Sequence, residues 1–289
     1  MIGQVARVAE ELGFAAIEMG EHIVVPGNYL GHAGMVWYDN FVLISHLATL
    51  TKRLRFHFNA LVAPYHPPVQ AAKMIATLDA IAEGRIAVTI GAGHVESEFE
   101  ALGVPYKTRA AMTDDYIKAM KALWTQERPT YHGRFVSFAD INFDPKCVQR
   151  PHVPLMIGGT GPKARRRVAE LGDGWVPNEG SLEEVSAGVQ EIKALTRAAG
   201  RDAESLRFAY RLPIGEPDPW TQKPHSPGHG PLRLPTEQPK TPDEIVVALK
   251  RYHQAGFDHM RIMYYSRNAQ ESMGKMEWFA KEVMPAFHI

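Results

Sequence analysis

The strongest constraint on the fold is a regular alternation between short apolar runs and longer amphipathic segments along nearly the whole chain. Residues 67–84 illustrate it: the segment opens with proline and closes with glycine, as helices do, and an apolar run at 85–91 follows it. Apolar strands that alternate with helices are typical of parallel sheets whose faces are covered by helices. The pattern therefore predicts an α/β protein.

Seven strands are expected from this pattern, at 14–20, 54–62, 85–91, 154–159, 173–177, 206–212 and 259–265. Residues 131–144 alternate like an additional hairpin, and a final helix is expected at about 269–287. A (β/α)8 TIM barrel needs one more strand before the first helix, yet the chain begins inside that helix. We expect such a barrel with its first strand absent, through truncation or a late start codon. An open doubly wound sheet is the alternative.

Length and composition fit one barrel domain over 1–289 and exclude several classes of partner. Lys+Arg and Asp+Glu both total 32, so no net charge favours nucleic acid or an anionic membrane. No apolar run approaches the ~20 residues of a membrane span, and the N-terminus carries charges where a signal peptide is apolar. The single cysteine, Cys147, excludes an internal disulfide and fits a reducing compartment. We expect a cytoplasmic protein.

One segment, residues 213–240, interrupts the alternation after the strand at 206–212. All but its first three residues, 216–240, form a stretch rich in proline and poor in apolar residues. Loops of this length are uncommon unless they are functional or disordered. Two interpretations stay open: a solvated insertion, or a mobile lid over the site, because barrel chemistry lies on the loops that follow the strands.

Candidate site residues are expected where strands end, because active sites of such barrels lie at the carboxyl ends of the strands. The first expected strand ends beside His22, which can act as acid or base near neutral pH, contact a cofactor ring or be an ordinary loop histidine. The third ends in Gly91-Ala92-Gly93-His94. A Rossmann interpretation of this turn is weak, since Glu96 stands at the place of the third glycine.

A second kind of site is expected after the fourth strand, in the sequence IGGTGPKARRR. A glycine-rich turn there enters a helix, with Thr160 and Lys163 close to the helix N-terminus. Backbone N–H groups, a hydroxyl and a cation together suit an anion such as phosphate. A tight turn before a basic surface helix is the alternative.

These stretches resemble the bacterial-luciferase-like flavin and deazaflavin oxidoreductases, which are (β/α)8 barrels. The resemblance is carried by AEELGFAAIEMGEH, HPPVQAAKMIATLDAIAEGRIAVTIGAGHVESEFEALGVPYKTR, VPLMIGGTGPKARRRVAELGDGWVP and DEIVVALKRYHQAGFDHMRI. The form GAGHxxxEFxALGVP looks more like the branch that uses the deazaflavin coenzyme F420 than like the FMN-dependent monooxygenases.

The resemblance also implies roles for individual residues. His22 matches the active-site histidine, and the Asn59–Ala60 bond matches a non-proline cis peptide beside the cofactor ring. The loop that includes Gly91, Gly93 and His94 matches the ring-contacting loop, although the family often has an aromatic or acidic residue in place of His94. The cofactor-phosphate loop is matched by Gly158, Gly159, Thr160 and Lys163, with Arg267 a weaker candidate for the same anionic tail. Glu98 and Arg109 match structural positions, and no metal is implied.

The function implied is hydride transfer between reduced F420 and a small organic substrate, by a homodimer. Two alternatives stay open: an FMN-dependent monooxygenase on the same barrel, and a non-catalytic cofactor-binding or degenerate barrel, which the absent first strand allows.

Overall fold

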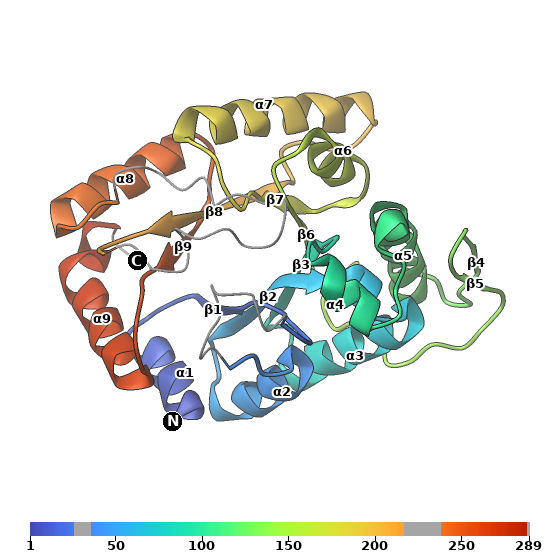
Figure 1. Ribbon diagram of the computed structural model, residues 1–289, viewed down its shortest axis with the longest axis horizontal. Coiled ribbons are helices and arrows are strands. Elements are labelled where there is room, and N and C mark those ends of the chain that lie inside the picture. Colours follow the sequence, from blue (N-terminus) through green and yellow to red (C-terminus); the bar gives the residue numbers. More distant parts are fainter. Residues whose placement is uncertain (26–35, 217–237, 288–289) are drawn as a thin grey trace. The chain divides into compact units, whose positions relative to one another are not determined.

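The computed structural model of the protein describes residues 1–25, 36–216 and 238–287. Seven strands form one mostly parallel sheet in the order β1-β2-β3-β6-β7-β8-β9 (Figure 1). Their bounds are Ala16–Met19 (β1), Arg55–Val62 (β2), Ile86–Gly91 (β3), Leu155–Gly158 (β6), Gly174–Val176 (β7), Arg207–Pro213 (β8) and His259–Met263 (β9). The α/β class and the seven expected strands are confirmed. Tyr131–His132 (β4) and Ser137–Phe138 (β5) pair as the expected antiparallel hairpin.

Helices connect successive strands of the sheet, as the alternation predicts. They are Ile2–Glu11 (α1), Asn40–Leu50 (α2), Pro68–Ile81 (α3), Glu96–Ala101 (α4), Arg109–Thr125 (α5), Pro162–Leu171 (α6), Leu182–Ala198 (α7), Pro242–Gln254 (α8) and Ala269–Glu282 (α9). The final helix is shorter than expected: α9 ends at Glu282, and Met284–Phe287 form a 3-10 turn. Pro285, inside that turn, has no N–H with which to continue the α-helix. Among the described residues, no strand precedes α1.

Two compact units divide the chain. The β1–β3 unit comprises described residues 16–25 and 36–156, and the β7–β9 unit comprises 1–15, 157–216 and 238–287, so that β6 contributes to both. Each unit is described by itself below. The single domain expected over 1–289 stays a prediction.

In the β1–β3 unit, β2 shows why the sequence forms a strand covered on one side by helices. Phe56, Phe58 and Leu61 are fully buried, and the ring of Phe58 lies 5.1 Å from that of Phe41 on α2. His57 lies between these residues in the strand, so its side chain belongs to the opposite face of the sheet. Helix packing therefore covers one face, and the polar residues of β2 lie on the other.

The β7–β9 unit repeats this arrangement. Tyr210 on β8 is buried and stacks on Tyr252 of α8, with ring centroids 4.6 Å apart. Trp175 on β7 packs against Gly188 of α7, where an added Cβ would lie 2.5 Å from the indole. The apolar face of these strands is thus the one that packs on helices.

The proline-rich insertion falls largely outside the described residues, which stop at 216 and resume at 238. Its two ends lie close together, because the N–H of Gly215 donates to the carbonyl of Pro239 at 2.9 Å. Lys240 Nζ also lies 2.9 Å from Glu216 Oε1. The lid interpretation stays a prediction. Of the helices that the structure describes, none combines the length and the apolar character needed to cross a bilayer.

Candidate active site

His22 lies just beyond the carboxyl end of β1 and is held by a buried carboxylate. Its Nδ1 lies 3.1 Å from Oε2 of Glu98 on α4, and the Glu98 side chain is only 1% exposed. The other oxygen, Oε1, accepts from the backbone N–H groups of Ile23 at 2.6 Å and Val24 at 3.2 Å. The hydroxyl of Tyr65 donates to Oε2 at 2.9 Å. One carboxylate therefore fixes both the histidine and the loop that carries it.

The surroundings of Glu98 keep it ionised. Burial raises the pKa of this carboxyl, but the hydrogen bond and charge of His22 and the N–H of Ile23 outweigh burial and bring the pKa below its usual value. Burial and the charge of Glu98 in turn raise the pKa of Tyr65 well above its usual range, so Tyr65 stays a donor. An ionised carboxylate can only accept hydrogen bonds. The proton between Glu98 and His22 therefore belongs to Nδ1, and whenever the His22 ring carries a single proton its lone pair lies on Nε2.

Aromatic and apolar side chains surround His22. The indole of Trp37 makes an edge-on contact with the imidazole, with ring centroids 4.8 Å apart, and the His94 ring lies at 6.4 Å. Ile23 and Val24, which follow His22 in the chain, are 42% and 43% exposed. A titratable group bordered by rings and exposed aliphatic side chains suits the binding of a flat organic molecule.

The loop after β3 is fixed from two sides. Gly93 has φ +77°, and a Cβ there would lie 2.7 Å from the ring of Phe99, so only glycine fits. Its carbonyl accepts from Arg109 Nε at 3.1 Å. The Arg109 guanidinium also lies over the ring of Tyr106, 3.7 Å from its centroid. Arg109 thus braces the turn, in agreement with the structural role expected for it.

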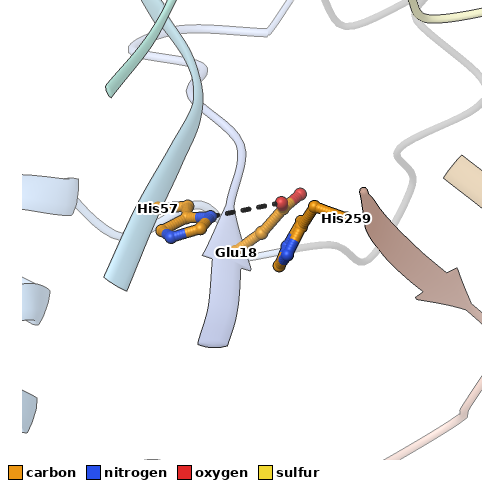
Figure 2. A group of neighbouring side chains, drawn as sticks. All are labelled: Glu18, His57 and His259. Atoms are coloured by element: carbon orange, nitrogen blue, oxygen red, sulfur yellow. Dashed lines mark ion pairs between the residues drawn. The ribbon is translucent and has the colours of Figure 1, made fainter. Parts of the chain in front are cut away.

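β2 contains the cis Asn59–Ala60 peptide that the resemblance implied. The pairing of β2 with β3 shifts register between Asn59 and Leu61. Asn59 Nδ2 donates to Oε2 of Glu18 at 3.0 Å, and Oε1 of Glu18 lies 3.6 Å from Nδ1 of His57 (Figure 2). Sequence reasoning missed Glu18 and His57. Their signal was the presence of charged or titratable residues inside otherwise apolar strands.

Glu21 is a second carboxylate that sequence reasoning missed. Its Oε1 lies 2.8 Å from Nε2 of His66 and its Oε2 accepts from the N–H of Val62 at 2.7 Å, while its side chain is 5% exposed. Glu21 ties the loop after β1 to the end of β2, and Glu98 ties the same loop to α4. The backbone on both sides of His22 is therefore anchored, by the Glu21 side chain before it and by the contacts of Glu98 with the N–H groups after it.

In the β7–β9 unit, the expected phosphate loop joins β6 to α6. The carbonyl of Gly159 accepts from Trp175 Nε1 at 2.7 Å, and that of Thr160 accepts from Arg165 at 3.1 Å, so the turn is well fixed. No side chain of the described residues caps α6, and Lys163 is exposed in its first turn.

Gly161 is the N-cap residue of α6 and leaves the N-terminus of that helix open. Its φ of −72° does not require glycine, and an added Cβ would meet no protein atom within 4 Å. A residue without a side chain at an open helix N-terminus lets an anion approach the N–H groups. The N-terminus of α6 is therefore open, and its role in holding a phosphate stays a prediction.

Arg267 is placed differently from the other candidates. Its Nε lies 3.0 Å from Oε2 of Glu271, and its own N–H donates to the same oxygen. These two bonds and the hydrogen bond from Lys275 lower the pKa of Glu271 to about 2. Arg267 thus binds the Glu271 side chain in the first turn of α9. Its role toward a cofactor stays a prediction.

The structure brings three of the expected clusters into one unit. All three lie in the β1–β3 unit: His22 follows β1, Asn59–Ala60 lies in the second half of β2, and Gly91–His94 begins at the last residue of β3. Residues Gly158–Lys163 begin at the last residue of β6, and all of them belong to the β7–β9 unit. Their roles in catalysis and cofactor binding stay predictions.

Comparison with known proteins gives matches over most of the chain. The family model for luciferase-like monooxygenases matches residues 2–214. The uncharacterized protein Rv0953c of Mycobacterium tuberculosis is 35% identical over 212 residues, covering 68% of this chain and 74% of its own length. An FMNH2-dependent dimethylsulfone monooxygenase of Pseudomonas putida is 33% identical over 201 residues, covering 68% of this chain and 53% of its own length.

Solved structures agree on the fold. An F420-dependent secondary alcohol dehydrogenase superposes with a TM-score of 0.81 at 18% identity, covering 98% of this chain and 93% of that one. A long-chain alkane monooxygenase also superposes with a TM-score of 0.81, at 15% identity, covering 99% of this chain and 83% of that one. Both F420-dependent and flavin-dependent proteins are therefore among its structural neighbours. The chain belongs to the luciferase-like monooxygenase family.

Proposed function

We propose that this protein is an oxidoreductase that transfers a hydride between the deazaflavin F420 and a small organic substrate, with His22 as the acid–base residue. The observation that carries the proposal is the contact between His22 Nδ1 and the ionised carboxylate of Glu98. It leaves Nε2 as the atom that takes or gives a proton. Oxidation of an alcohol to a carbonyl compound releases one hydride and one proton, and Nε2 would accept that proton.

The cofactor, when bound, supplies the hydride donor or acceptor. In this proposal the Asn59–Ala60 and Gly91–His94 segments contact its ring, while the turn at Gly158–Lys163 holds its phosphate. The open position at Gly161 supports this phosphate assignment. Trp37 and the exposed aliphatic side chains beside His22 would limit the access of water to the reacting atoms.

An FMN-dependent monooxygenase is the second candidate. It is favoured by the FMNH2-dependent dimethylsulfone monooxygenase that is 33% identical to this chain. Calorimetric titration of the purified protein with F420 and with FMN separates the two. We expect F420 to bind more tightly, because GAGHxxxEFxALGVP resembles the F420 branch. The reverse order would favour the monooxygenase, and binding of neither would favour a non-catalytic barrel.

The phosphate assignment has its own test in Lys163→Ala. A charge-assisted contact to phosphate contributes about 1.5–3 kcal/mol, so the dissociation constant of the cofactor should rise about ten- to hundred-fold. The melting temperature should hardly change, because Lys163 is exposed. Arg166→Ala is the matched control: Arg166 is a 63%-exposed cation on the same helix, paired with Glu170. Equal cofactor affinity in both variants and wild type would contradict the phosphate assignment and favour a purely structural role for the turn at Gly158–Lys163.

A further inference from the structure

Two side chains from different loops meet at the same oxygen of Glu98. His22 Nδ1 lies 3.1 Å from Oε2, and the hydroxyl of Tyr65 donates to Oε2 at 2.9 Å. Tyr65 ends the 3-10 turn Ala63–Tyr65 that follows β2, whereas His22 follows β1. The carboxylate on α4 therefore receives the histidine and the tyrosine from the ends of two neighbouring strands.

The Tyr65 hydroxyl is held in place by the packing of its ring. The residue is 9% exposed, and its ring makes an edge-on contact with Phe99, with centroids 4.8 Å apart. Phe99 follows Glu98 in α4, so the same helical turn positions the ring and the carboxylate. The Glu98 side chain is 1% exposed, so water has little access to Oε2.

Both donors draw on the negative charge of one oxygen. Burial raises the pKa of Glu98, whereas the contact of His22 and, to a smaller extent, the Tyr65 hydroxyl lower it. The hydroxyl thus helps to keep the carboxylate ionised, and it takes up part of the charge that would otherwise act on His22. Neighbouring hydrogen bonds change one another's strength by about 10–30%. Loss of the hydroxyl should therefore strengthen the contact between Glu98 and His22.

We infer that Tyr65 is a positioning residue for the acid–base step, because its hydroxyl limits how strongly Glu98 attracts the His22 ring. A stronger attraction stabilises the doubly protonated ring, which then holds its Nε2 proton more tightly. In this assignment Tyr65 acts through Glu98 and touches neither substrate nor cofactor. The acid–base role of His22 rests on the proposed function, whereas the influence of Tyr65 on His22 can be measured on the protein without cofactor.

Other titratable groups lie close to these two residues. The His94 ring, from the loop after β3, lies 6.4 Å from that of His22, and Glu21 precedes His22 in the chain. Glu21 and Tyr106 are also close enough to act on Tyr65. A change of the Tyr65 hydroxyl alone leaves all of these groups in place, so Tyr65→Phe isolates its influence.

The test is NMR of the Nδ1–H proton of His22, without cofactor and at a pH at which the ring carries one proton. Wild type is compared with Tyr65→Phe and Tyr106→Phe. Tyr106 supplies the matched control, because its ring also packs edge-on against Phe99 while its hydroxyl donates to the carbonyl of His94. We expect the signal to move downfield in Tyr65→Phe, as for a stronger hydrogen bond, and to stay at its wild-type position in the control. An unmoved signal in Tyr65→Phe, or the same shift in both variants, would overturn the inference.

Incorporation of 3-fluorotyrosine tests the same contact where Tyr65→Phe does not fold. The fluorinated phenol is more acidic and donates a stronger hydrogen bond, so the His22 signal should move upfield in labelled wild type. Labelled Tyr106→Phe should show the same upfield shift. No shift, or a downfield one, in labelled wild type would overturn the inference.

Turnover gives the readout for the acid–base step itself. With reduced F420 and a carbonyl substrate, Tyr65→Phe should keep its kcat to higher pH than wild type, because Nε2 holds the proton that it donates more tightly. KM should hardly change, since Tyr65 does not touch the substrate. The same pH profile in both proteins would overturn the role in the acid–base step. Absence of turnover by wild type would count against the proposed function alone, because the NMR signal decides separately whether Tyr65 acts on His22.

Discussion

Glu98→Gln is the substitution that most directly probes how this site is built. The carboxylate accepts four hydrogen bonds, two at each oxygen. In the variant, the remaining carbonyl oxygen can still accept from the N–H groups of Ile23 and Val24. The new amide N–H2 then faces His22 and Tyr65, and it can only donate. His22 must therefore move its proton from Nδ1 to Nε2, and the Tyr65 hydroxyl must become an acceptor.

The cost follows from the contacts exchanged. A hydrogen bond to a charged group is worth about 1.5–3 kcal/mol, and we expect the free energy of unfolding to fall by about that amount at neutral pH. The difference should depend on pH, because the pKa of Glu98 is lower in the folded protein than in the unfolded chain. Its stabilisation is complete above the unfolded pKa of about 4.3 and is lost as the pH falls through the folded value. The gap between wild type and variant should therefore narrow below about pH 4.

The assay combines urea unfolding at several pH values with ¹⁵N NMR of the histidine rings, in which His22→Asn identifies the His22 signals. Wild type should show the Nδ1–H tautomer at His22 and Glu98→Gln the Nε2–H tautomer. Glu96→Gln is the control, an exposed acid two residues earlier on the same helix, and should match wild type in both measurements. The same tautomer in wild type and Glu98→Gln, or a stability gap independent of pH, would refute the reasoning.

Two further predictions concern the same unit. Tyr65→Phe removes one hydrogen bond to Glu98 and should lower the free energy of unfolding by about 1.5–3 kcal/mol in urea titrations; an unchanged midpoint would contradict the role given to this hydroxyl. Gly93→Ala places a Cβ 2.7 Å from Phe99 and should cost about 1–3 kcal/mol more than Gly103→Ala, which has a similar positive φ but open space. An equal fall in the free energy of unfolding in the two alanine variants would contradict this prediction, because it would mean that the Phe99 ring moves away at no cost.

The fold was predictable because its signal is local. Each strand and each helix face is encoded by residues close together in the chain, and the expected strand at 206–212 is displaced by only one residue from the observed Arg207–Pro213. The end of α9 was less predictable, since the apolar pattern continues past the point at which Pro285 changes the helix type.

The candidate site was predictable only in part, because its contacts join distant segments. Strand ends pointed to His22 and Gly93 directly. Glu98, however, is 76 residues away from His22, and it lies in an acidic run with Glu96 and Glu100. Only the packing of α4 decides which of the three carboxylates is buried, and no spacing in the sequence reports that choice.

Hydride transfer itself is tested most directly by following oxidation of reduced F420 by the purified protein with a panel of small ketones and aldehydes, without oxygen. The proposed function predicts turnover under these anaerobic conditions, and loss of turnover in His22→Asn while F420 still binds. No turnover of reduced F420, together with substrate oxidation that requires both reduced FMN and oxygen, would contradict hydride transfer and establish the monooxygenase.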